Sequence, residues 1–539
     1  MRNIQEFSAY CQGDNWTPAV QQAIREKVDG IFFPEGEYHF CRSGAEVRYC
    51  FVTNNDEGLK NLIFNVGERD SFVICGQNAR FIFHDRVVPF RFEKVKNLQL
   101  MGFSMDFAVS PVIEAVVADR GDDWVSLRFP EDRPYWIIDG KICFINDEYK
   151  FINKTFGYTV FDVEKGEMAA GRDGGTFSYR AEEIEPQLVK LGLLYGDVKV
   201  GETVVFKPEP RLAPGIVLDA CRGVQLTDIN IYCASGMGVI AQNSFDIDLL
   251  RVNVGLRPGS KRLISVSDDA THFANCGGRI TIKHCRFERQ WDDAVNIHGV
   301  YRNLFYNRVG EQVDWYLKTE QFQQLGVDFA EDGEHLLISG KIYTIKKIYN
   351  GKQNSVLITD EPLDTATQYR ASVLNCDRQP DVEIRNCVFN GNKPRGVLIS
   401  TGGHVVVEEN YFHTPGAAIF IPGDAEFWYE AGPVRDVLIR DNEFDNCFYQ
   451  GFCASTSAVI CTHPRVPDHI PGTFYHRNIR IVDNRFRDNH GRLINALLTD
   501  ELLISGNSWK KDDTYSAQAP GEHIILNDCG KVITENNDF

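Results

Sequence analysis

One short template recurs along the chain and limits the folds that it can adopt. It reads apolar, any residue, apolar, two residues of any kind, Asn or Cys, any residue, and a large apolar residue. Recurrence of this kind is the sequence signature of a repeat architecture. Copies end at Phe287, Phe389, Phe412, Phe444, Phe486, Trp509 and Phe539, and looser copies end at Met105, Ile231 and Val254.

The period and chemistry of the template predict its structure. Ile231 and Val254 are 23 residues apart, as are Phe389 and Phe412. Each copy begins with a period-2 apolar alternation, which is typical of a strand with one buried face, and its Asn suits a turn. Together these features predict an all-β parallel β-helix whose coils stack about 4.8 Å apart. A leucine-rich or other solenoid is disfavoured because helical periodicity is nearly absent between the strands.

Two intervals between copies are too long for loops and predict inserted domains. Met105 to Ile231 spans 126 residues and Phe287 to Phe389 spans 102, and both stretches alternate apolar and polar residues. We expect each to be an antiparallel β-barrel or sandwich. Near the N-terminus, Thr17-Pro18 is expected to start a helix that caps the stack. The predicted parts are a cap with the first coils (1–109), an inserted barrel (110–212), central coils (213–302), a second inserted barrel (303–376) and C-terminal coils (377–539).

The net charge, the hydropathy and the cysteine content of the chain limit its expected partners, location and redox state. The formal net charge is −18 and the pI is about 5.2, so we expect no nucleic acid as a partner, and neutral sugars fit better. The sequence contains no run of eighteen apolar residues, which a membrane-spanning helix would need, and its first residues lack the apolar core of a secretory signal. This predicts a cytoplasmic protein, or a secreted one if a signal segment preceded Met1. Fifteen cysteines without a Cys-x-x-Cys pair predict reduced thiols. The sequence allows a homodimer.

The densest polar cluster lies beside the second insert, in the segments SVSDDATHFANCGG, WDDAVNIHG and NKPRGVLISTGG. Counting one 23-residue period back from Asp292 gives Asp269, so we expect Asp269 beneath Asp292. This requires the ten extra residues of that coil to precede Asp269. Arg395 occupies the position after Phe389 that Asp293 occupies after Phe287, and is expected above it. Repulsion among three carboxylates would raise at least one pKa and separate an acid from a base.

Other readings of these residues stay open. An Asp-Asp pair is most often a solvated turn, and the carboxylates with Asn296 would also suit calcium. His298 and His272 are candidates to donate to a sugar hydroxyl, or to be bonded at strand ends. In GDAEFWYEAG, Trp428 could stack on a sugar face and Glu430 could bind hydroxyls, although large aromatic groups are usually buried.

In their order, SDDATHF, WDDAVNIHG, PRGVLISTGG and GDAEFWYEAGPVRDVLI resemble the α-1,3-galactosidases of glycoside hydrolase family 110. The resemblance spans most of the chain. It implies a right-handed β-helix with two inserted barrels, and an exo-acting hydrolase that removes terminal α-1,3-linked galactose from galactosides or glycans with inversion, using no metal and no organic cofactor.

The resemblance also implies roles for residues. The catalytic aspartates match Asp269, Asp292 and Asp293; by similarity to polygalacturonases, Asp292 is expected to be the general acid, with the other two positioning and deprotonating water. Arg395, Trp428 and Glu430 match positions that line the galactose pocket. The alternatives are a polygalacturonase-like inverting glycosidase acting on uronates, and a non-catalytic carbohydrate-binding β-helix.

Overall fold

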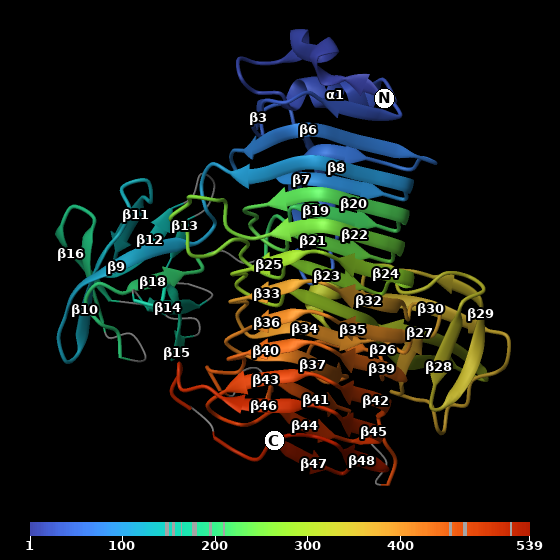
Figure 1. Cartoon of the computed structure of the whole chain (residues 1–539). Helices are drawn as coiled ribbons and strands as arrows, with labels where there is room; N and C mark the ends of the chain where they lie inside the picture. Colours follow the sequence, from blue (N-terminus) through green and yellow to red (C-terminus); the bar gives the residue numbers. More distant parts are fainter. Residues whose placement is uncertain are drawn as a thin grey trace.

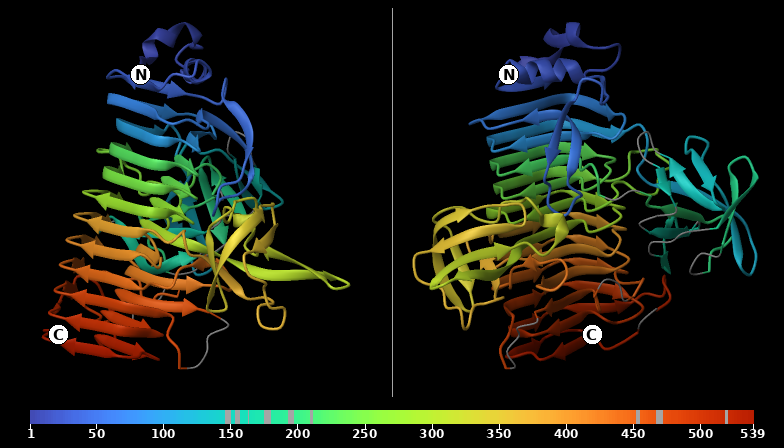
Figure 2. Two further views of the ribbon diagram at one scale, coloured as in Figure 1. Left: turned by 90° about the vertical axis from the view of Figure 1, so that its right-hand side faces the viewer. Right: turned by 180° about the vertical axis from the view of Figure 1, so that it is seen from behind.

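The computed structural model of the chain describes residues 1–145, 150–152, 157–162, 164–174, 180–192, 197–208, 211–451, 455–466, 472–517 and 520–539. These residues stack into one long solenoid that runs from a helical cap at the top of Figure 1 to the C-terminus at its base. Two β-rich inserts leave the solenoid on opposite sides, as the view from behind in Figure 2 also shows. The predicted parallel β-helix is confirmed, because strands of successive coils pair in parallel.

One face of the solenoid is a twenty-stranded sheet that contains the repeated template. Its strands are β1 (Arg2–Asn3), β2 (Gly30–Phe33), β3 (Glu37–Phe40), β6 (Phe72–Phe83), β8 (Lys96–Phe107), β20 (Arg222–Ile231), β22 (Phe245–Val254), β24 (Gly277–Lys283), β25 (Arg286–Glu288), β32 (Asp381–Arg385), β33 (Val388–Asn390), β35 (His404–Glu408), β36 (Tyr411–His413), β39 (Asp436–Arg440), β40 (Glu443–Asp445), β42 (His476–Val482), β43 (Arg485–Asp488), β45 (Thr499–Ser505), β46 (Ser508–Lys511) and β48 (Val532–Glu535).

The opposite face carries the polar cluster. Its strands are β4 (Glu46–Cys50), β5 (Gly58–Val66), β7 (Val88–Glu93), β19 (Ile216–Asp219), β21 (Val239–Gln242), β23 (Thr271–Ala274), β26 (Val295–Val309), β34 (Arg395–Ser400), β37 (Ala417–Asp424), β41 (Ile460–Arg465), β44 (Ile494–Leu497) and β47 (Ile524–Asn527). Strands of successive coils on this face pair in parallel, and β4 pairs antiparallel with β5 in a hairpin. The short strand β38 (Glu430–Ala431) pairs antiparallel with β26.

The asparagines of the template form a ladder inside the turns. The Asn410 Nδ2 donates to Asn442 Oδ1, and Asn442 Nδ2 donates to Asn484 Oδ1, each at 3.0 Å. Asn507 and Asn537 continue the ladder. Each side-chain amide thus bonds the Asn of the next coil toward the C-terminus, so the Asn column limits how far one coil can slide on the next.

A stack of aromatic rings runs beside the ladder in the core. Phe389 and Phe412 lie with ring centroids 4.4 Å apart and planes at 5°, and Phe444 and Phe486 continue the stack at centroid spacings of 5.1 and 4.8 Å. All four rings are buried. Stacking at the coil spacing buries a continuous apolar core that no single coil could form alone.

The N-terminal end of the stack is covered by a helical cap. It consists of the 3₁₀ helix η1 (Ile4–Tyr10) and the α-helix α1 (Thr17–Arg25). The expected helix is confirmed, but Thr17 is not its cap: the N-cap is Trp16, and the Thr17 amide donates to Asn15 Oδ1. No helix among the described residues has the length and apolar character needed to cross a bilayer.

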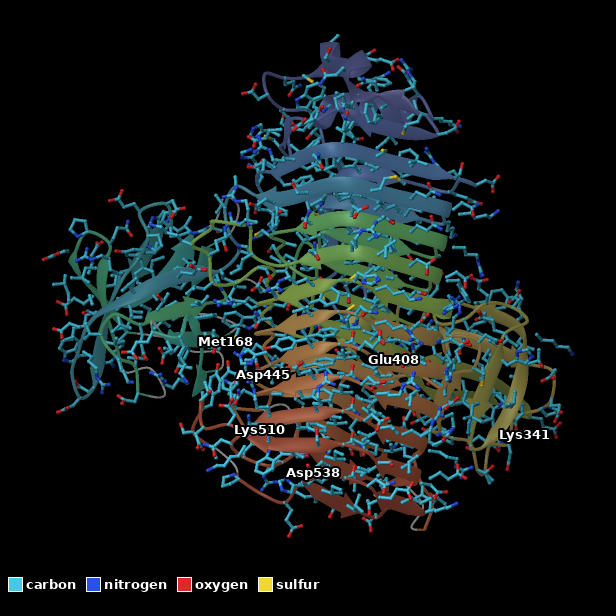
Figure 3. All side chains as sticks on the ribbon, in the orientation of Figure 1. Met168, Lys341, Glu408, Asp445, Lys510 and Asp538 are labelled. Atoms are coloured by element: carbon cyan, nitrogen blue, oxygen red, sulfur yellow. The ribbon has the colours of Figure 1, made fainter. Side chains whose placement is uncertain are left out.

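The first insert is antiparallel and leaves the solenoid after β8. Its seven-stranded sheet contains β9 (Ile113–Arg120), β10 (Trp124–Arg128), β14 (Tyr158–Asp162), β15 (Glu167–Gly174), β16 (Ala181–Glu185), β17 (Leu188–Gly192) and β18 (Thr203–Phe206). A three-stranded sheet contains β11 (Tyr135–Ile138), β12 (Lys141–Ile145) and β13 (Lys150–Ile152). The insert returns to the lower coils, where the Tyr449 hydroxyl donates to the carbonyl of Met168, labelled in Figure 3.

The second insert is a closed antiparallel barrel. Its strands are the C-terminal part of β26, β27 (Gln312–Lys318), β28 (His335–Ile338), β29 (Lys341–Tyr349), β30 (Asn354–Thr359) and β31 (Ser372–Asn375), and it includes the 3₁₀ helix η2 (Phe322–Gln324). Pairing runs from β26 through β27, β30, β29, β28 and β31 back to β26. Because β26 begins in the solenoid, the barrel is joined directly to the coil that carries the polar cluster.

We predict that the Asn ladder contributes to stability. Asn442 is fully buried, and Asn442→Ala would remove the hydrogen bonds of its side chain to the Val407 carbonyl, to Asn484 Oδ1 and to the backbone and side-chain amides of Asn410. The Asn410 backbone amide would lose its acceptor. Each buried polar group left unpaired costs about 1–3 kcal/mol, so the thermal midpoint should fall by several degrees. Asn442→Cys should lose less, because Cys387 in the same column donates to backbone carbonyls. An unchanged midpoint for Asn442→Ala would contradict this role.

Candidate active site

Parallel pairing brings the three predicted aspartates together. Asp269 lies two residues before β23, and Asp292 and Asp293 lie just before β26, where the chain bends at residues 291, 292 and 294. One oxygen from each carboxylate lies within 4.8 Å of the others. Asp269 and Asp293 are 2% and 1% exposed, whereas the side chain of Asp292 is 20% exposed. The trio therefore has one member near solvent and two behind it.

The register differs from the prediction by one residue. Thr271 lies opposite Val295, so Asp269 is level with Asp293, and Asp268 is level with Asp292. The expectation that Asp269 lies beneath Asp292 is therefore wrong. Pairing between β22 and β24 shifts by one residue at a bulge, where Gly278 has a φ of +67°. Nine of the ten extra residues thus precede Asp269, and the tenth lies in this bulge after it.

Two arginines neutralise the carboxylates. Arg395 is level with Asp293, as predicted, and its Nε donates to Asp293 Oδ1 at 2.6 Å. Arg211 donates from Nη2 to Asp292 Oδ2 and from Nε to Asp268 Oδ1, both at 2.8 Å. Lys207 donates to the same Asp268 oxygen. The sequence pattern did not identify Arg211, Lys207 or Asp268.

Burial and these contacts give the three aspartates different pKa values. Burial raises the pKa of Asp269 well above its ordinary value, and the charge of Asp292 adds to the rise. Burial likewise raises the pKa of Asp293, against the opposing effect of Arg395. Burial also acts on Asp292, but Arg211 and Arg395 outweigh it and lower its pKa. Protons therefore reside first on Asp269 and Asp293 in the unliganded site. This differs from the expectation that Asp292 carries the acid proton, because Arg211, which lowers the pKa of Asp292, lies outside the repeat and was not expected here.

The other predicted polar residues lie around the trio, with one exception. Asp269 Oδ2 contacts His272 Nδ1 at 2.6 Å, and Glu430, 6% exposed, accepts from Asn54 Nδ2 at 3.3 Å. His298 does not reach the cavity, because its Nδ1 contacts the Gly299 carbonyl and its Nε2 faces His272. The expectation that His298 donates to a sugar hydroxyl is therefore not met in this arrangement.

The trio opens into a cavity with unused polar atoms. Among the described residues, the buried Asp293 Oδ2 and Asn296 Oδ1 have no hydrogen-bond partner. Both belong to residues of the cavity wall, so a bound molecule with hydroxyl groups could satisfy them. The cavity is lined by Asn54, Arg211, Asp269, His272, Asp292, Asp293, Asn296, Arg395, Trp428 and Glu430.

An aromatic side chain stands at the edge of the cavity. Trp428 is 36% exposed, and the Arg211 guanidinium lies 5.8 Å from the centroid of its indole. The second insert holds this segment, because Gln321 Nε2 donates to the Phe427 carbonyl and Gln324 Nε2 to the Trp428 carbonyl. Asn54, which follows the β4 strand, closes the cavity from the coils nearer the N-terminus.

Two groups in the described part of the chain have the composition of a metal site. They are Asp269 with Asp292 and Asp293, and His272 with His298 and Glu430. In the first group, Arg395 Nε bonds Asp293 Oδ1 and Arg211 Nη2 bonds Asp292 Oδ2, so two positive side chains already offset the charge of these carboxylates. The arginines act as counter-ions that reduce the repulsion among the carboxylates.

Comparison with known proteins gives related sequences over nearly the whole chain. A family model described as "Right handed beta helix region" matches residues 347–508. The alpha-1,3-galactosidase A of Shewanella woodyi is 31% identical, covering 98% of this chain and 88% of that protein. The alpha-1,3-galactosidase B of Bacteroides thetaiotaomicron is 29% identical, covering 97% and 88%. An exopolygalacturonase structure from Thermotoga maritima aligns at 11% identity with a TM-score of 0.40, covering 99% of this chain and 91% of that one.

We predict opposite effects on stability for two aspartates. The pKa of Asp269 is raised above its unfolded value of about 3.9, so its stabilising effect is present below that pH and is lost as pH rises through the raised pKa. Asp269→Asn should therefore match or exceed the parent in thermal midpoint at pH 8, with the difference shrinking toward pH 4.

Asp292→Asn provides the matched control. The pKa of Asp292 is lowered, so its contribution is present above about pH 3.9 and is lost as pH falls through the lowered pKa. This variant should lower the midpoint at pH 7, because Arg211 loses its carboxylate partner. Parallel midpoint curves for the two variants from pH 4 to pH 8 would show that the trio does not split as described.

Proposed function

The chain belongs to the α-1,3-galactosidase family and is a glycoside hydrolase, and we propose that it is a family 110 enzyme that removes terminal α-1,3-linked galactose from galactosides or glycans. The observation that carries this proposal is the cavity in which Asp269, Asp292 and Asp293 meet. Its unpartnered oxygens suit sugar hydroxyls, and Trp428 offers an aromatic face at its edge. Walls on several sides favour exo action, because a cavity of this kind admits a chain end.

The proposed reaction uses the trio as one titrating unit. Asp292 lies nearest to solvent and receives a proton from the Asp269 and Asp293 pair. It then gives that proton to the glycosidic oxygen as the bond from this oxygen to the anomeric carbon breaks. Water forms the new bond to the anomeric carbon, and its released proton returns to the pair. The number of protons on the trio is therefore the same before and after turnover.

Asp292 can act as the acid only if its pKa rises when the substrate binds. Arg211 and Arg395 lower that pKa in the unliganded site. A sugar that excludes water and draws hydrogen bonds from these guanidinium groups would weaken their hold on Asp292. This retains the predicted catalytic set of Asp269, Asp292 and Asp293, with the order of protonation taken from their contacts.

Inversion of configuration is the part of the proposal that rests on resemblance. Most inverting glycosidases separate their carboxyl groups by about 6.5–9.5 Å so that water fits between acid and base. Here the nearest carboxylate oxygens lie within 4.8 Å, so their separation does not by itself favour inversion. The resemblance to family 110, and to polygalacturonases that invert with a comparable trio, supports it.

The two alternative functions, a uronate-cleaving glycosidase and a non-catalytic sugar-binding protein, are disfavoured for different reasons. A polygalacturonase-like enzyme needs positive charge free to bind a uronate carboxylate, but Arg211 and Arg395 are both paired with aspartates. A non-catalytic carbohydrate-binding β-helix is disfavoured by the similarity to hydrolases over nearly the full chain.

We predict that the protein hydrolyses an α-1,3-linked digalactoside and does not act on polygalacturonate. Proton NMR during the first turnovers should show β-galactose appearing before mutarotation produces the α anomer. Initial release of α-galactose would replace inversion by retention while leaving the galactosidase proposal in place. Absence of hydrolysis on α-1,3-galactosides would refute the proposed substrate.

We predict that Asp269→Asn, Asp292→Asn and Asp293→Asn each reduce kcat/KM by about 10²–10⁴-fold, the range for general acid and base groups. The matched control is Asp219→Asn, because burial raises the pKa of Asp219 to about 6 but the residue does not line the cavity. Asp219→Asn should stay within a few-fold of the parent. Retained activity in one of the three test variants would remove that aspartate from the catalytic set.

A further inference from the structure

A chain of three short contacts leads from the catalytic cavity into the interior. Asp269 Oδ2 lies 2.6 Å from His272 Nδ1, and His272 Nε2 lies 2.9 Å from His298 Nε2. The far end is closed by His298 Nδ1, which lies 2.6 Å from the carbonyl oxygen of Gly299. Both imidazoles are 1% exposed, so no contact with bulk water substitutes for these partners.

Counting protons along these contacts gives a definite result. A carbonyl oxygen only accepts, so His298 Nδ1 carries a proton. The contact between the two Nε2 atoms needs one proton, since two lone pairs would otherwise face each other at 2.9 Å. The contact between Asp269 and His272 needs another. Satisfying all three contacts therefore takes three protons, whereas an ionised Asp269 with two neutral imidazoles carries only two.

We propose that His272 and His298 are positioning residues that hold this third proton beside Asp269. The three contacts together then act as a proton store for the reaction. The inference rests on the proposed function, since it assigns the source of the proton that Asp292 donates. The store gives one proton to Asp292, which passes it to the glycosidic oxygen. The water that attacks the anomeric carbon then returns its proton to Asp269. Each turnover therefore leaves the store as it began.

The store also explains how Asp269 can serve as a base. After the third proton has left, the lone pairs of the two Nε2 atoms face each other in the interior, which is unfavourable at low dielectric. Once it has lost its third proton, the proton store therefore binds a proton strongly. His298 exerts this effect without lining the cavity, because its Nε2 bonds His272 Nε2 at 2.9 Å, whereas Glu430 Oε1 lies farther away at 3.7 Å.

The charges around the store decide where its proton sits. Glu430, Asp292 and Asp268 face His272 with negative charge, and Arg211 faces it with positive charge. Glu430 also faces His298, with Oε1 3.7 Å from Nε2, and acts to raise its pKa. Burial is the largest effect and lowers the pKa of both histidines to about 4. Burial and Asp292 raise the pKa of Asp269, while Arg211 and Arg395 oppose the rise. The arrangement with a protonated Asp269 and two neutral imidazoles therefore predominates.

A proton fits the contact between the histidines better than a metal ion does. Two imidazole nitrogens on a tetrahedral zinc, each at about 2.0–2.1 Å, would lie about 3.3 Å apart. The observed separation is 2.9 Å, which is a hydrogen-bond length. Glu430 Oε1, the third group within reach, accepts from Asn54 Nδ2.

The pH dependence of kcat/KM on an α-1,3-galactoside tests the store. His298→Phe keeps a ring of similar size but offers His272 no acceptor, so the third proton is no longer needed. The alkaline limb should move to lower pH by at least one unit. His298→Gln should shift it less, because its carboxamide can accept from His272. The control is His476→Phe, at a fully buried histidine outside the cavity, which should leave the profile unchanged. Thermal midpoints identify any variant that fails to fold.

Neutron diffraction of the parent at neutral pD provides a readout independent of activity. It should show a deuteron in each of the three contacts. The proposed store would be overturned by a neutron map with only two deuterons in these contacts. It would also be overturned if folded His298→Phe had the same alkaline limb as the parent, or if a chelator abolished activity and zinc restored it. If no α-galactoside is cleaved, the proposed function fails, and the neutron map still decides whether the third proton is present.

Discussion

The parallel register of β23, β26 and β34 is the constraint on which the site depends. It places Asp269, Asp293 and Arg395 at one level of three successive coils. A slip of one residue between these strands would move the three side chains off this common level. The contact between the Phe287 and Phe389 rings, whose centroids lie 5.5 Å apart, holds the coils of β26 and β34 against such a slip, and the Asn ladder begins in the next coil at Asn410. The repeat thus supplies both the stability of the solenoid and the geometry of its polar cluster.

This geometry concentrates charges that would otherwise be unfavourable. Three buried or half-buried carboxylates repel one another, and their desolvation is offset only because Arg211, Arg395 and Lys207 bond them or their neighbour Asp268. The two inserts supply part of this environment. Lys207 and Arg211 follow the last strand of the first insert, and the second insert holds the backbone of Trp428. The inserts therefore complete a site that the solenoid alone leaves open. Such a cluster of buried like charges lowers stability, which is common at sites where function requires it.

Most of the fold and much of the site follow from the sequence, for physical reasons. The template exposes its period because every coil must present apolar residues to the same core, and the same period placed Arg395 level with Asp293. The bulge at Gly278 was missed because one added residue leaves the apolar pattern intact. Arg211 and Asn54 lie outside the repeat, in segments whose position depends on tertiary packing. His298 was expected at the sugar because sequence spacing does not reveal which groups take up both ring nitrogens.

The most direct test is a crystal structure of the Asp292→Asn variant with an intact α-1,3-linked digalactoside. The terminal galactose should occupy the cavity, with hydroxyls on Asp293 Oδ2 and Asn296 Oδ1 and the glycosidic oxygen within hydrogen-bond distance of the side chain at position 292. A sugar bound instead in the separate cavity lined by Asp219 and Arg378, with the trio unoccupied, would contradict the account.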